Sequence, residues 1–480
     1  MIKAGFFETD ITASIGMERP ATYYKLYHTT IHDPLKVRAC VIDDGQERVA
    51  IVGLDTCILG SKTVQKARRA VKDTCGIPEA NILLAASHTH AGGSLWGFCE
   101  EDLIGAPDLI KRLALVESIS MDTDYERHVI GQVKTAVVMA DRCKQPARLG
   151  IGRGFEDQVA FNRRFRMKNG RTVTHPGKGH PDIVAPAGPM DPEVGVIAAW
   201  DRNDKLIGCV VNYACHGTCY GDGVSADWIY YLEQTVRAVN GCQSNVVFLN
   251  GACGDITQVD NQSLRQIESG EKGSKFVGSR VGAEVLKVLV SSEKSEKFKL
   301  AVLSESLRLK IRKPSRKSIE AARMLCERML SEPKKTTEFH FAKERLILDY
   351  LVSKSDTQML EIQVIQIGPA VILANPAEYF CQYGLDIKKR SNFPYTFVVE
   401  LANGCAGYVP TEDAFDPEHG GGYETVLTSC SNLESGAGRA IMDASLRLAK
   451  ALVPGNEPVG EQVQPAVGVW VYGALGPELD

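Results

Sequence analysis

The segment NILLAASHTH (residues 81–90) is an apolar run of β type that ends abruptly in histidines. Similar runs, each ending in Gly, His, Asn, Asp or Glu, are ERVAIVGLD (47–55), LIGCVVNYACHG (206–217), SNVVFLNGACGD (244–255), AVILANPAEYF (370–380) and YTFVVELANGCAGY (395–408). The first of these is followed by a helical period, KTVQKARRAVKDTCG (62–76), which stops at a glycine. This alternation predicts an α/β fold with a mixed β-sheet core flanked by helices.

The polar ends of these runs predict one convergent site. In α/β sheets, chemistry gathers where several strands end, because the strands fix the loops that follow them. Turn chemistry explains the Gly, Asn and Asp residues, but it does not explain the His and Glu residues.

Bulk composition limits the partners and the compartment. The chain has 480 residues, 14 cysteines and a formal net charge of -4, so we expect neither nucleic acid nor an anionic membrane surface as partner. No apolar run is long enough for stable membrane insertion. The N-terminus MIKAGFFETDITASIG has no basic and apolar leader, and no CxxC pair occurs. We therefore expect free thiols and a cytoplasmic protein.

Two segments differ in composition from the rest. Residues 291–350 are rich in Lys, Glu and Arg and contain the amphipathic pattern IEAARMLCERML. We interpret this charged helical segment as a solvated face. Residues 177–193 are rich in Gly and Pro and predict a long loop near the site. No internal repeat is visible in the sequence.

The histidines indicate a metal site. His88 and His90 are one residue apart, so on an extended segment both side chains would face one pocket. His216 follows another apolar run. Imidazole is the commonest zinc ligand, and a catalytic zinc keeps an open position beside about three protein ligands. Glu378 is the best placed carboxylate, with Asp55, Asp227 and Asp255 as alternatives that are individually more typical of caps and turns.

Other polar residues have both a chemical and a structural interpretation. Arg163, in FNRRFRMK, could clamp a carboxylate or stabilise an oxyanion, although most arginines are surface residues. In NGACGDITQ (250–258), Cys253 is more typical of a small buried thiol than of a nucleophile. Thr257 has a hydroxyl that a base or a metal would have to activate.

Several motifs together resemble the catalytic domain of the neutral ceramidases. They are, in order, IHDPLKVRACVIDDGQERVAIVGLD, NILLAASHTHAGGS, VNYACHGTCYG with SADW, NGACGDITQ, NPAEYF, and NGCAGYVPTEDAF with GGGYET. The resemblance covers nearly the whole chain, and it implies a zinc-dependent hydrolase of N-acyl amide bonds. It also implies a domain at 1–455, with 456–480 as a tail and without the C-terminal immunoglobulin-like domain that the ceramidases add.

The resemblance assigns roles by motif. The ligand positions fall on His88, His216, Glu378 and Tyr408, of which Tyr408 has the shorter-than-expected spacing from Glu378. His90 takes the position of a histidine that holds the substrate carbonyl or its oxyanion. Asn162, Arg163 and Tyr423 take positions that contact substrate.

One motif departs from the family in a way that bears on mechanism. The family has Gly-Asp-x-Ser-Pro with a proposed serine nucleophile, whereas this chain has Gly-Asp-Ile-Thr-Gln at 254–258. Thr257 keeps the hydroxyl but adds a methyl group that restricts its rotamers. The nucleophile is therefore either metal-activated water, with Asp255 or metal-bound hydroxide as base, or a metal-activated Thr257.

Three functions remain open at this level. The first is amide hydrolysis of a small, polar N-acyl compound with Zn²⁺ as cofactor. The second is hydrolysis of an ester, lactone or carbohydrate derivative by the same metal, because function belongs to the site and not to the scaffold. The third is a non-catalytic metal-binding protein. The apolar tail VQPAVGVWVYGALGPELD (463–480) either closes a sheet in its own subunit or packs on a neighbour, so a homo-oligomer is possible.

Overall fold

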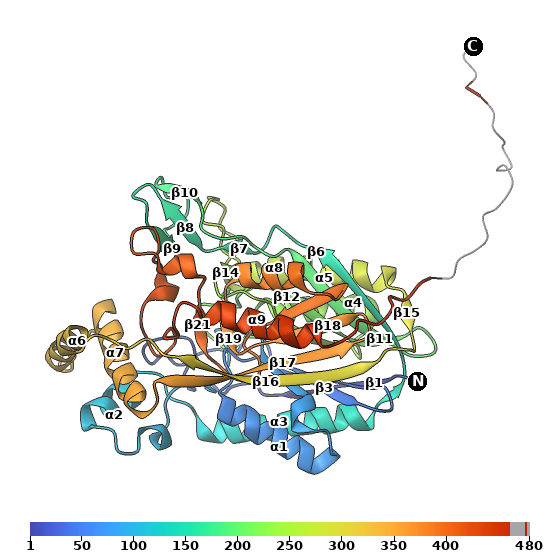
Figure 1. The fold of residues 1–480 in the computed structure, drawn as a ribbon, viewed down its shortest axis with the longest axis horizontal. Coiled ribbons are helices and arrows are strands. Elements are labelled where there is room, and N and C mark those ends of the chain that lie inside the picture. The colour runs from blue at the N-terminus through green and yellow to red at the C-terminus, as the bar shows by residue number, and fades with distance from the viewer. Residues whose placement is uncertain (461–475, 478–480) are drawn as a thin grey trace.

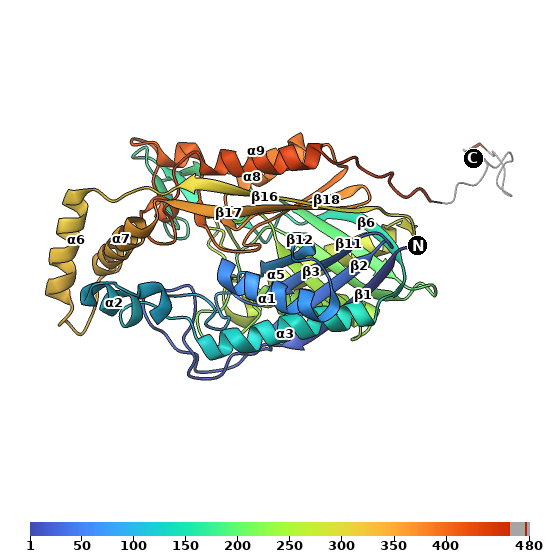
Figure 2. The ribbon, with the colours of Figure 1, turned by 60° about the horizontal axis from the view of Figure 1, so that its bottom comes forward.

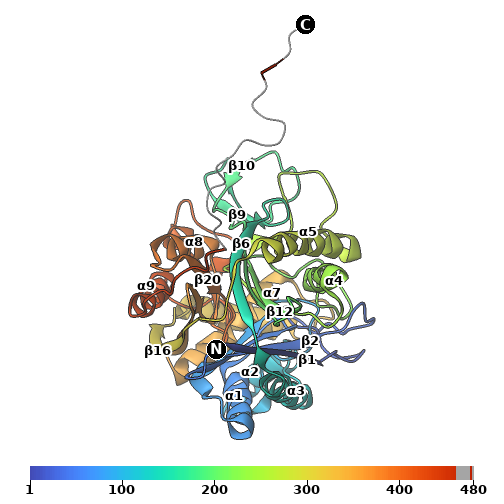
Figure 3. The same cartoon turned by 90° about the vertical axis from the view of Figure 1, so that its right-hand side faces the viewer.

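The computed structural model describes residues 1–460 and 476–477, so most of the apolar tail lies outside the described residues. The described chain folds around three large β-sheets, each covered on its outer face by a pair of helices (Figures 1 and 3). Within each sheet, neighbouring strands include both antiparallel and parallel pairs. This confirms the predicted mixed α/β fold.

The first sheet comes from the N-terminal part of the chain and has the order β4-β3-β2-β1-β5. Its strands are β1 (Lys3–Asp10), β2 (Lys36–Asp43), β3 (Arg48–Leu54), β4 (Ile82–Ala86) and β5 (Gln145–Pro146). Helices α1 (Ser61–Cys75) and α3 (Thr123–Arg142) pack against it with their apolar faces. As predicted, α1 stops at Gly76, whose φ of 74° needs the freedom of glycine.

The second sheet has the order β13-β12-β11-β6-β15. Its strands are β6 (Arg148–Phe155), β11 (Glu193–Trp200), β12 (Leu206–Tyr213), β13 (Asn245–Asn250) and β15 (Lys294–Ser295). Helices α4 (Trp228–Asn240) and α5 (Gly270–Ser291) cover it.

The third sheet has the order β16-β17-β18-β20. Its strands are β16 (Leu300–Lys310), β17 (Thr357–Ile367), β18 (Ala370–Ala374) and β20 (Tyr395–Val399). Helices α8 (Cys381–Arg390) and α9 (Ala437–Lys450) cover it, and Figure 3 shows the three helix pairs around the three sheets.

The three sheets share one topology, which the sequence did not reveal. In each, three antiparallel strands lead into a parallel strand–helix–strand crossover, β3-α1-β4, β12-α4-β13 or β18-α8-β20, and a second helix follows. Apolar side chains from all three sheets, such as Ile51, Val247 and Ile372, meet in one central core cluster. The expectation of no repeat therefore holds for the sequence but not for the described structure, because burial constrains polarity and size rather than residue identity.

Smaller elements surround one end of this body. They are β7 (Phe161–Asn162), β8 (Arg164–Met167), β9 (Thr172–Thr174), β10 (Ile183–Pro186), β14 (Ile256–Thr257), β19 (Ala377–Tyr379), β21 (Gly407–Val409), α2 (Asp108–Leu115), α6 (Arg316–Met329) and α7 (Thr337–Lys354). Short 3₁₀ turns occupy Glu79–Asn81, Glu100–Leu103, Glu412–Phe415 and Tyr423–Thr425. Figure 2 shows α2, α6 and α7 grouped beyond the ends of the large sheets.

Two local predictions need correction. Residues 177–193 are not wholly a loop, because they contain strand β10, which pairs with β8. The charged stretch 291–350 is not only a solvated helical face, because it contains β16 and because the inner side of α7 is buried against α2 and α6. Charge count alone does not distinguish a solvated lysine from one that is buried with partners. Among the described residues, no helix is long and apolar enough to cross a membrane.

Candidate metal centre and cavity

Each of the three repeated units delivers one polar side chain to a common point. His88 follows β4, His216 follows β12, and Glu378 lies in β19 directly after β18. All three side chains are almost fully buried, with His216 at 0% relative exposure. The convergence predicted from the strand ends is therefore present in the structure.

The ligand atoms of these residues have the spacing of a metal site. The distance from Glu378 Oε2 to His88 Nε2 is 3.4 Å, and that to His216 Nε2 is 3.8 Å. Two ligands about 2.0–2.1 Å from a tetrahedral ion lie about 3.4 Å apart. Glu378 Oε2 is buried and has no hydrogen-bond partner. A buried carboxylate oxygen without a partner is costly, and a cation would satisfy it.

Backbone carbonyls orient both imidazoles. His88 Nδ1 lies 2.9 Å from the Cys57 carbonyl oxygen, and His216 Nδ1 lies 2.9 Å from that of Ile256. Because a carbonyl only accepts, each Nδ1 carries a proton, which leaves Nε2 as the nitrogen that can offer a lone pair to a metal. This arrangement is typical of histidines that bind a metal through Nε2.

The electrostatics of the two histidines differ in an informative way. Burial, followed by the charge of Arg163, lowers the pKa of His216 well below its usual value, so this imidazole stays neutral. Burial also acts to lower the pKa of His88, but Cys57 and Glu378 overcome it and raise that pKa well above its usual value. Cys57 and Glu378 therefore favour a positive charge at the position of His88. A divalent cation bound there can supply this charge in place of the proton.

The side chain of His90 also lies next to His88, but the backbone conformation that brings it there differs from the one predicted. His88 has φ of 63°, in the left-handed region, so the His-x-His segment is not a continuous extended strand. The rings of His88 and His90 still meet at a centroid distance of 4.9 Å, with their Nε2 atoms 3.4 Å apart. Burial, then His88 and Arg163, lowers the pKa of His90 well below its usual value.

Arg163 is a buried arginine and not a surface one. Its Nε donates to Glu424 Oε1 at 2.7 Å, and its Nη2 donates to the Gly254 carbonyl at 2.8 Å. Its Nη1 lies 3.2 Å from His216 Nε2. Glu424 is fully buried and therefore holds the guanidinium in one orientation.

Two tyrosines border the centre. Tyr408 pairs with Glu378 in the parallel register of β19 and β21, and burial raises the pKa of its hydroxyl well above the usual value. The ring of Tyr423 packs edge-on against Tyr408, and its hydroxyl is 3.0 Å from that of Tyr23. Both tyrosines therefore line the same cavity as His88 and Glu378, and Tyr408 is adjacent in the sheet to a candidate ligand.

The remaining predicted residues, Asp255, Asn162 and Thr257, make hydrogen bonds to other protein groups. Asp255 accepts from the backbone N–H of Cys381 at 2.8 Å and from Asn162 Nδ2 at 2.7 Å, and burial raises its pKa to about 6. Thr257 Oγ1 accepts from Val259 N at 3.2 Å. None of Asp255, Asn162 and Thr257 lines the cavity described next.

The alternative aspartates have structural partners. Asp55 forms a buried ion pair with Arg38 at 2.7 Å. Asp227 caps the N-terminus of α4 through the Trp228 N–H.

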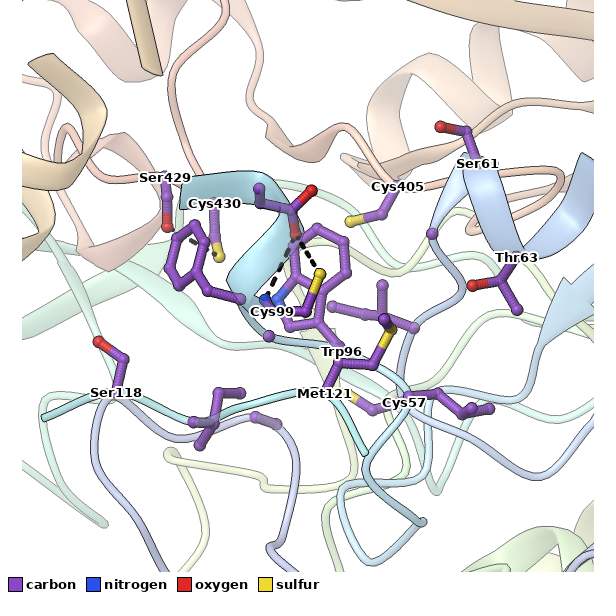
Figure 4. Close-up of a pocket in the computed structure, with 18 of the residues that line it drawn as sticks. Cys57, Ser61, Thr63, Trp96, Cys99, Ser118, Met121, Cys405, Ser429 and Cys430 are labelled. Carbon is purple, nitrogen blue, oxygen red and sulfur yellow. Dashed lines mark hydrogen bonds between the residues drawn. The ribbon is translucent and has the colours of Figure 1, made fainter. Parts of the chain in front are cut away.

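A cavity of about 520 Å³ opens beside the centre and is lined by His88, His90, Glu378, Tyr408 and Tyr423. Figure 4 draws part of its wall, which combines Trp96 and Met121 with the thiols of Cys57, Cys99, Cys405 and Cys430. Leu351 and Lys354 of α7 complete one side. Two of the three metal-ligand candidates, His88 and Glu378, thus lie at the wall of a cavity large enough for a small organic molecule.

Sequence reasoning missed three residues that shape the centre. Glu424 orients Arg163, and Cys57 contacts His88. Glu400 accepts from the backbone N–H groups of Cys253 and Tyr379, next to ligand-bearing segments. Glu400 directly follows β20, and Cys57 comes three residues after the end of β3, so the strand-end rule that found His88 could have found both.

The fold and the centre together define a mixed α/β protein with a buried His-His-Glu cluster at the wall of a cavity. No family model and no curated protein matches the sequence. Among solved structures, the neutral ceramidase from Pseudomonas aeruginosa is similar over 98% of this chain and 78% of its own, with a TM-score of 0.67 and 19% identity. A structure described as ceramidase complexed with C2 is similar over 98% of this chain and 79% of its own, with a TM-score of 0.67 and 17% identity. This chain therefore has a neutral ceramidase-like fold.

Proposed function

We propose that this protein is a zinc-dependent hydrolase that cleaves the amide bond of an N-acyl compound. The observation that carries the proposal is the unpartnered Glu378 Oε2, buried between two histidines whose Nε2 atoms are free to bind a metal. The ceramidase-like fold supports the same reaction class.

The proposed ligands are His88, His216, Glu378 and Tyr408. Two nitrogens and two oxygens fit zinc, which accepts such mixed ligand sets. When bound, zinc would act as a Lewis acid and would make water a nucleophile near neutral pH.

His90 and Arg163 are the proposed donors to the substrate oxygen. His90 stays neutral because burial lowers its pKa, so it can donate one N–H without carrying charge. Arg163 stays charged, and Glu424 fixes its orientation. Donors that are held in place before the reaction stabilise a developing oxyanion without further reorganisation.

The cavity wall favours an acyl group with an apolar part. Four apolar side chains lie in the lining, namely Leu95, Trp96, Phe98 and Ile119. Acidic and basic groups such as Lys62 and Asp102 also line the cavity and are partly exposed, so a polar leaving group has partners there. The expected polar substrate stays a prediction, which we refine to a polar compound with an apolar acyl chain.

The engaged position of Thr257 favours water over a threonine nucleophile. Its hydroxyl is already engaged, because it accepts a hydrogen bond from the backbone N–H of Val259. We expect Thr257→Ala to keep most of the activity. A loss as large as that of His88→Ala, without a loss of metal, would instead support the covalent route.

The direct test is a substrate panel with controlled metal content. Amides that carry acyl chains of increasing length, and their matched esters, are assayed with metal-free protein and after zinc is restored. We expect zinc-dependent amide hydrolysis that the double variant His88→Ala/His216→Ala lacks and that His128→Ala, at an exposed histidine on α3, retains. Cleavage of esters alone would reject the amide assignment, and no cleavage of either class would reject the hydrolase.

A further inference from the structure

Cys57 is a sulfur ligand candidate that the proposed centre does not use. It follows β3, is fully buried as a residue, and lines the cavity (Figure 4). Its Sγ lies 3.6 Å from His88 Nδ1, while its own carbonyl accepts from the same nitrogen. A thiol therefore lies directly beside the imidazole that is proposed to bind zinc.

His90 completes a second group of ligand atoms. Sulfur of Cys57 and one nitrogen each of His88 and His90 all lie within 4.8 Å of one another. Ligand atoms on a tetrahedral ion are about 3.4–3.6 Å apart for nitrogen and sulfur ligands, and His88 Nε2 lies 3.4 Å from His90 Nε2. This group differs from the His88-His216-Glu378 group in having sulfur in place of a carboxylate.

We propose that Cys57, His88 and His90 form an alternative metal position that selects soft ions such as Cd²⁺. Thiolate and imidazole ligands favour soft and borderline ions, whereas the carboxylate and phenol oxygens of the first position favour harder ones. His88 belongs to both groups, and a neutral imidazole gives its lone pair to one ion at a time. The two positions are therefore filled in alternation and not together.

Occupation of the sulfur position has a defined chemical balance. The Cys57 thiol loses its proton to solvent as the sulfur–metal bond forms, and no electron is transferred. The ion occupies His90, which the proposed function uses to hold the substrate oxygen, and it withdraws His88 from Glu378 and His216. A soft ion at this position consequently inhibits the proposed activity, while the binding itself does not depend on that activity.

The test uses cadmium binding to the full chain in a background without the two exposed thiols, Cys143→Ala/Cys242→Ala. One equivalent of cadmium is added, and sulfur ligation is read from the thiolate-to-metal absorption band and from X-ray absorption at the cadmium edge. We expect sulfur ligation in the background protein. It should be lost in Cys57→Ala and retained in Cys405→Ala, which removes another cavity thiol.

A second pair of variants separates this inference from the proposed function. His216→Ala removes a ligand of the first position only, so it should lose zinc but keep the cadmium–sulfur signal. Cys57→Ala should keep zinc, which also shows that the variant is folded. Absence of sulfur ligation in the background protein, or its persistence in Cys57→Ala, would overturn the alternative position whatever the zinc results are.

Discussion

At the scale of single residues, Arg163 is fixed on two of its three nitrogens. Nε donates to Glu424 and Nη2 donates to the Gly254 carbonyl. The remaining nitrogen, Nη1, lies next to His216 Nε2 at the centre. A metal bound to His216 Nε2 would occupy that lone pair. Nη1 would then be the donor that is left for a substrate oxygen.

We therefore expect Arg163→Ala to lower kcat/KM by about 100- to 1,000-fold, the usual cost of one lost oxyanion donor. Zinc content should stay unchanged, because Arg163 is not a ligand. Lysine should not restore the rate, because a single ammonium group cannot contact Glu424 and the Gly254 carbonyl and still point a donor to the centre. Steady-state kinetics test this, with the exposed Arg171→Ala as control. An unaltered kcat/KM in Arg163→Ala would remove the residue from the mechanism.

Glu400 provides a pH-dependent prediction for the metal-free protein. Burial raises its pKa from 4.5 to about 8, although it accepts hydrogen bonds from Cys253 and Tyr379. Between these values the folded protein keeps a proton that the unfolded chain gives up. The free energy of unfolding should therefore fall by a few kcal/mol as pH rises from about 4.5 to about 8.

Glu400→Gln cannot titrate and should lose this part of the pH dependence. Its stability relative to the wild type should thus increase from pH 5 to pH 8, as measured by urea unfolding at each pH. Parallel pH profiles for the two proteins would show that Glu400 does not hold the proton.

The residues of the candidate site could be predicted from the sequence only where a local sequence pattern marks them. His88, His216 and Glu378 could be found because each follows an apolar strand. The pairing of Arg163 with Glu424 spans 261 positions in the sequence and leaves no local signature. The geometry of His88 and His90 was also beyond reach, because the left-handed φ of His88 depends on its surroundings and not on its neighbours in sequence.

At the scale of elements, the glycine-rich loop after β13 packs directly on the segment that carries Glu378. Gly254 donates its N–H to the Tyr379 carbonyl at 2.9 Å. A Cβ atom at this position would lie 2.4 Å from the Glu378 carbonyl oxygen, which is too close for the two backbones to stay in place. The role of this glycine is therefore the close approach of two backbone segments.

Gly254→Ala should accordingly shift Glu378 and weaken zinc binding, with a loss of stability of about 1–3 kcal/mol from overpacking. Competition with a chelator measures the affinity. Gly131→Ala is the matched control, because nothing lies within 4 Å of its added Cβ and it sits inside α3. Equal zinc affinity in the two variants would contradict the packing argument.

Helix α7 shows why the charged segment was misjudged. Lys343 is fully buried, and its Nζ donates to the Glu117 carbonyl at 2.8 Å, to Ser118 Oγ at 2.6 Å and to the Tyr23 carbonyl. These three acceptors come from segments that border the cavity. A sequence window reports the charge but not such distant acceptors, so it predicts solvation by default.

At the scale of the whole molecule, three units of one topology build the centre jointly. Each contributes one candidate ligand from the segment after a crossover strand, the second strand in the first unit and the first strand in the other two, and all three pack on the same central core. The fold class and the convergence of strand ends were predictable, because both follow from apolar runs of strand length. The threefold arrangement was not, since it requires knowing which strands pair. The domain boundary near 455, the possible homo-oligomer and the cytoplasmic location stay predictions.

The most direct test of the central claim is the zinc content of the purified protein after metal removal and zinc resupply, measured for three proteins. The wild type and His128→Ala should each bind about one zinc ion per chain, and His88→Ala/His216→Ala should bind little. Equal zinc content in all three, or none in the wild type, would contradict the metal centre. The buried Glu378 would then belong to a structural cluster, and the likeness to ceramidases would extend to the fold alone.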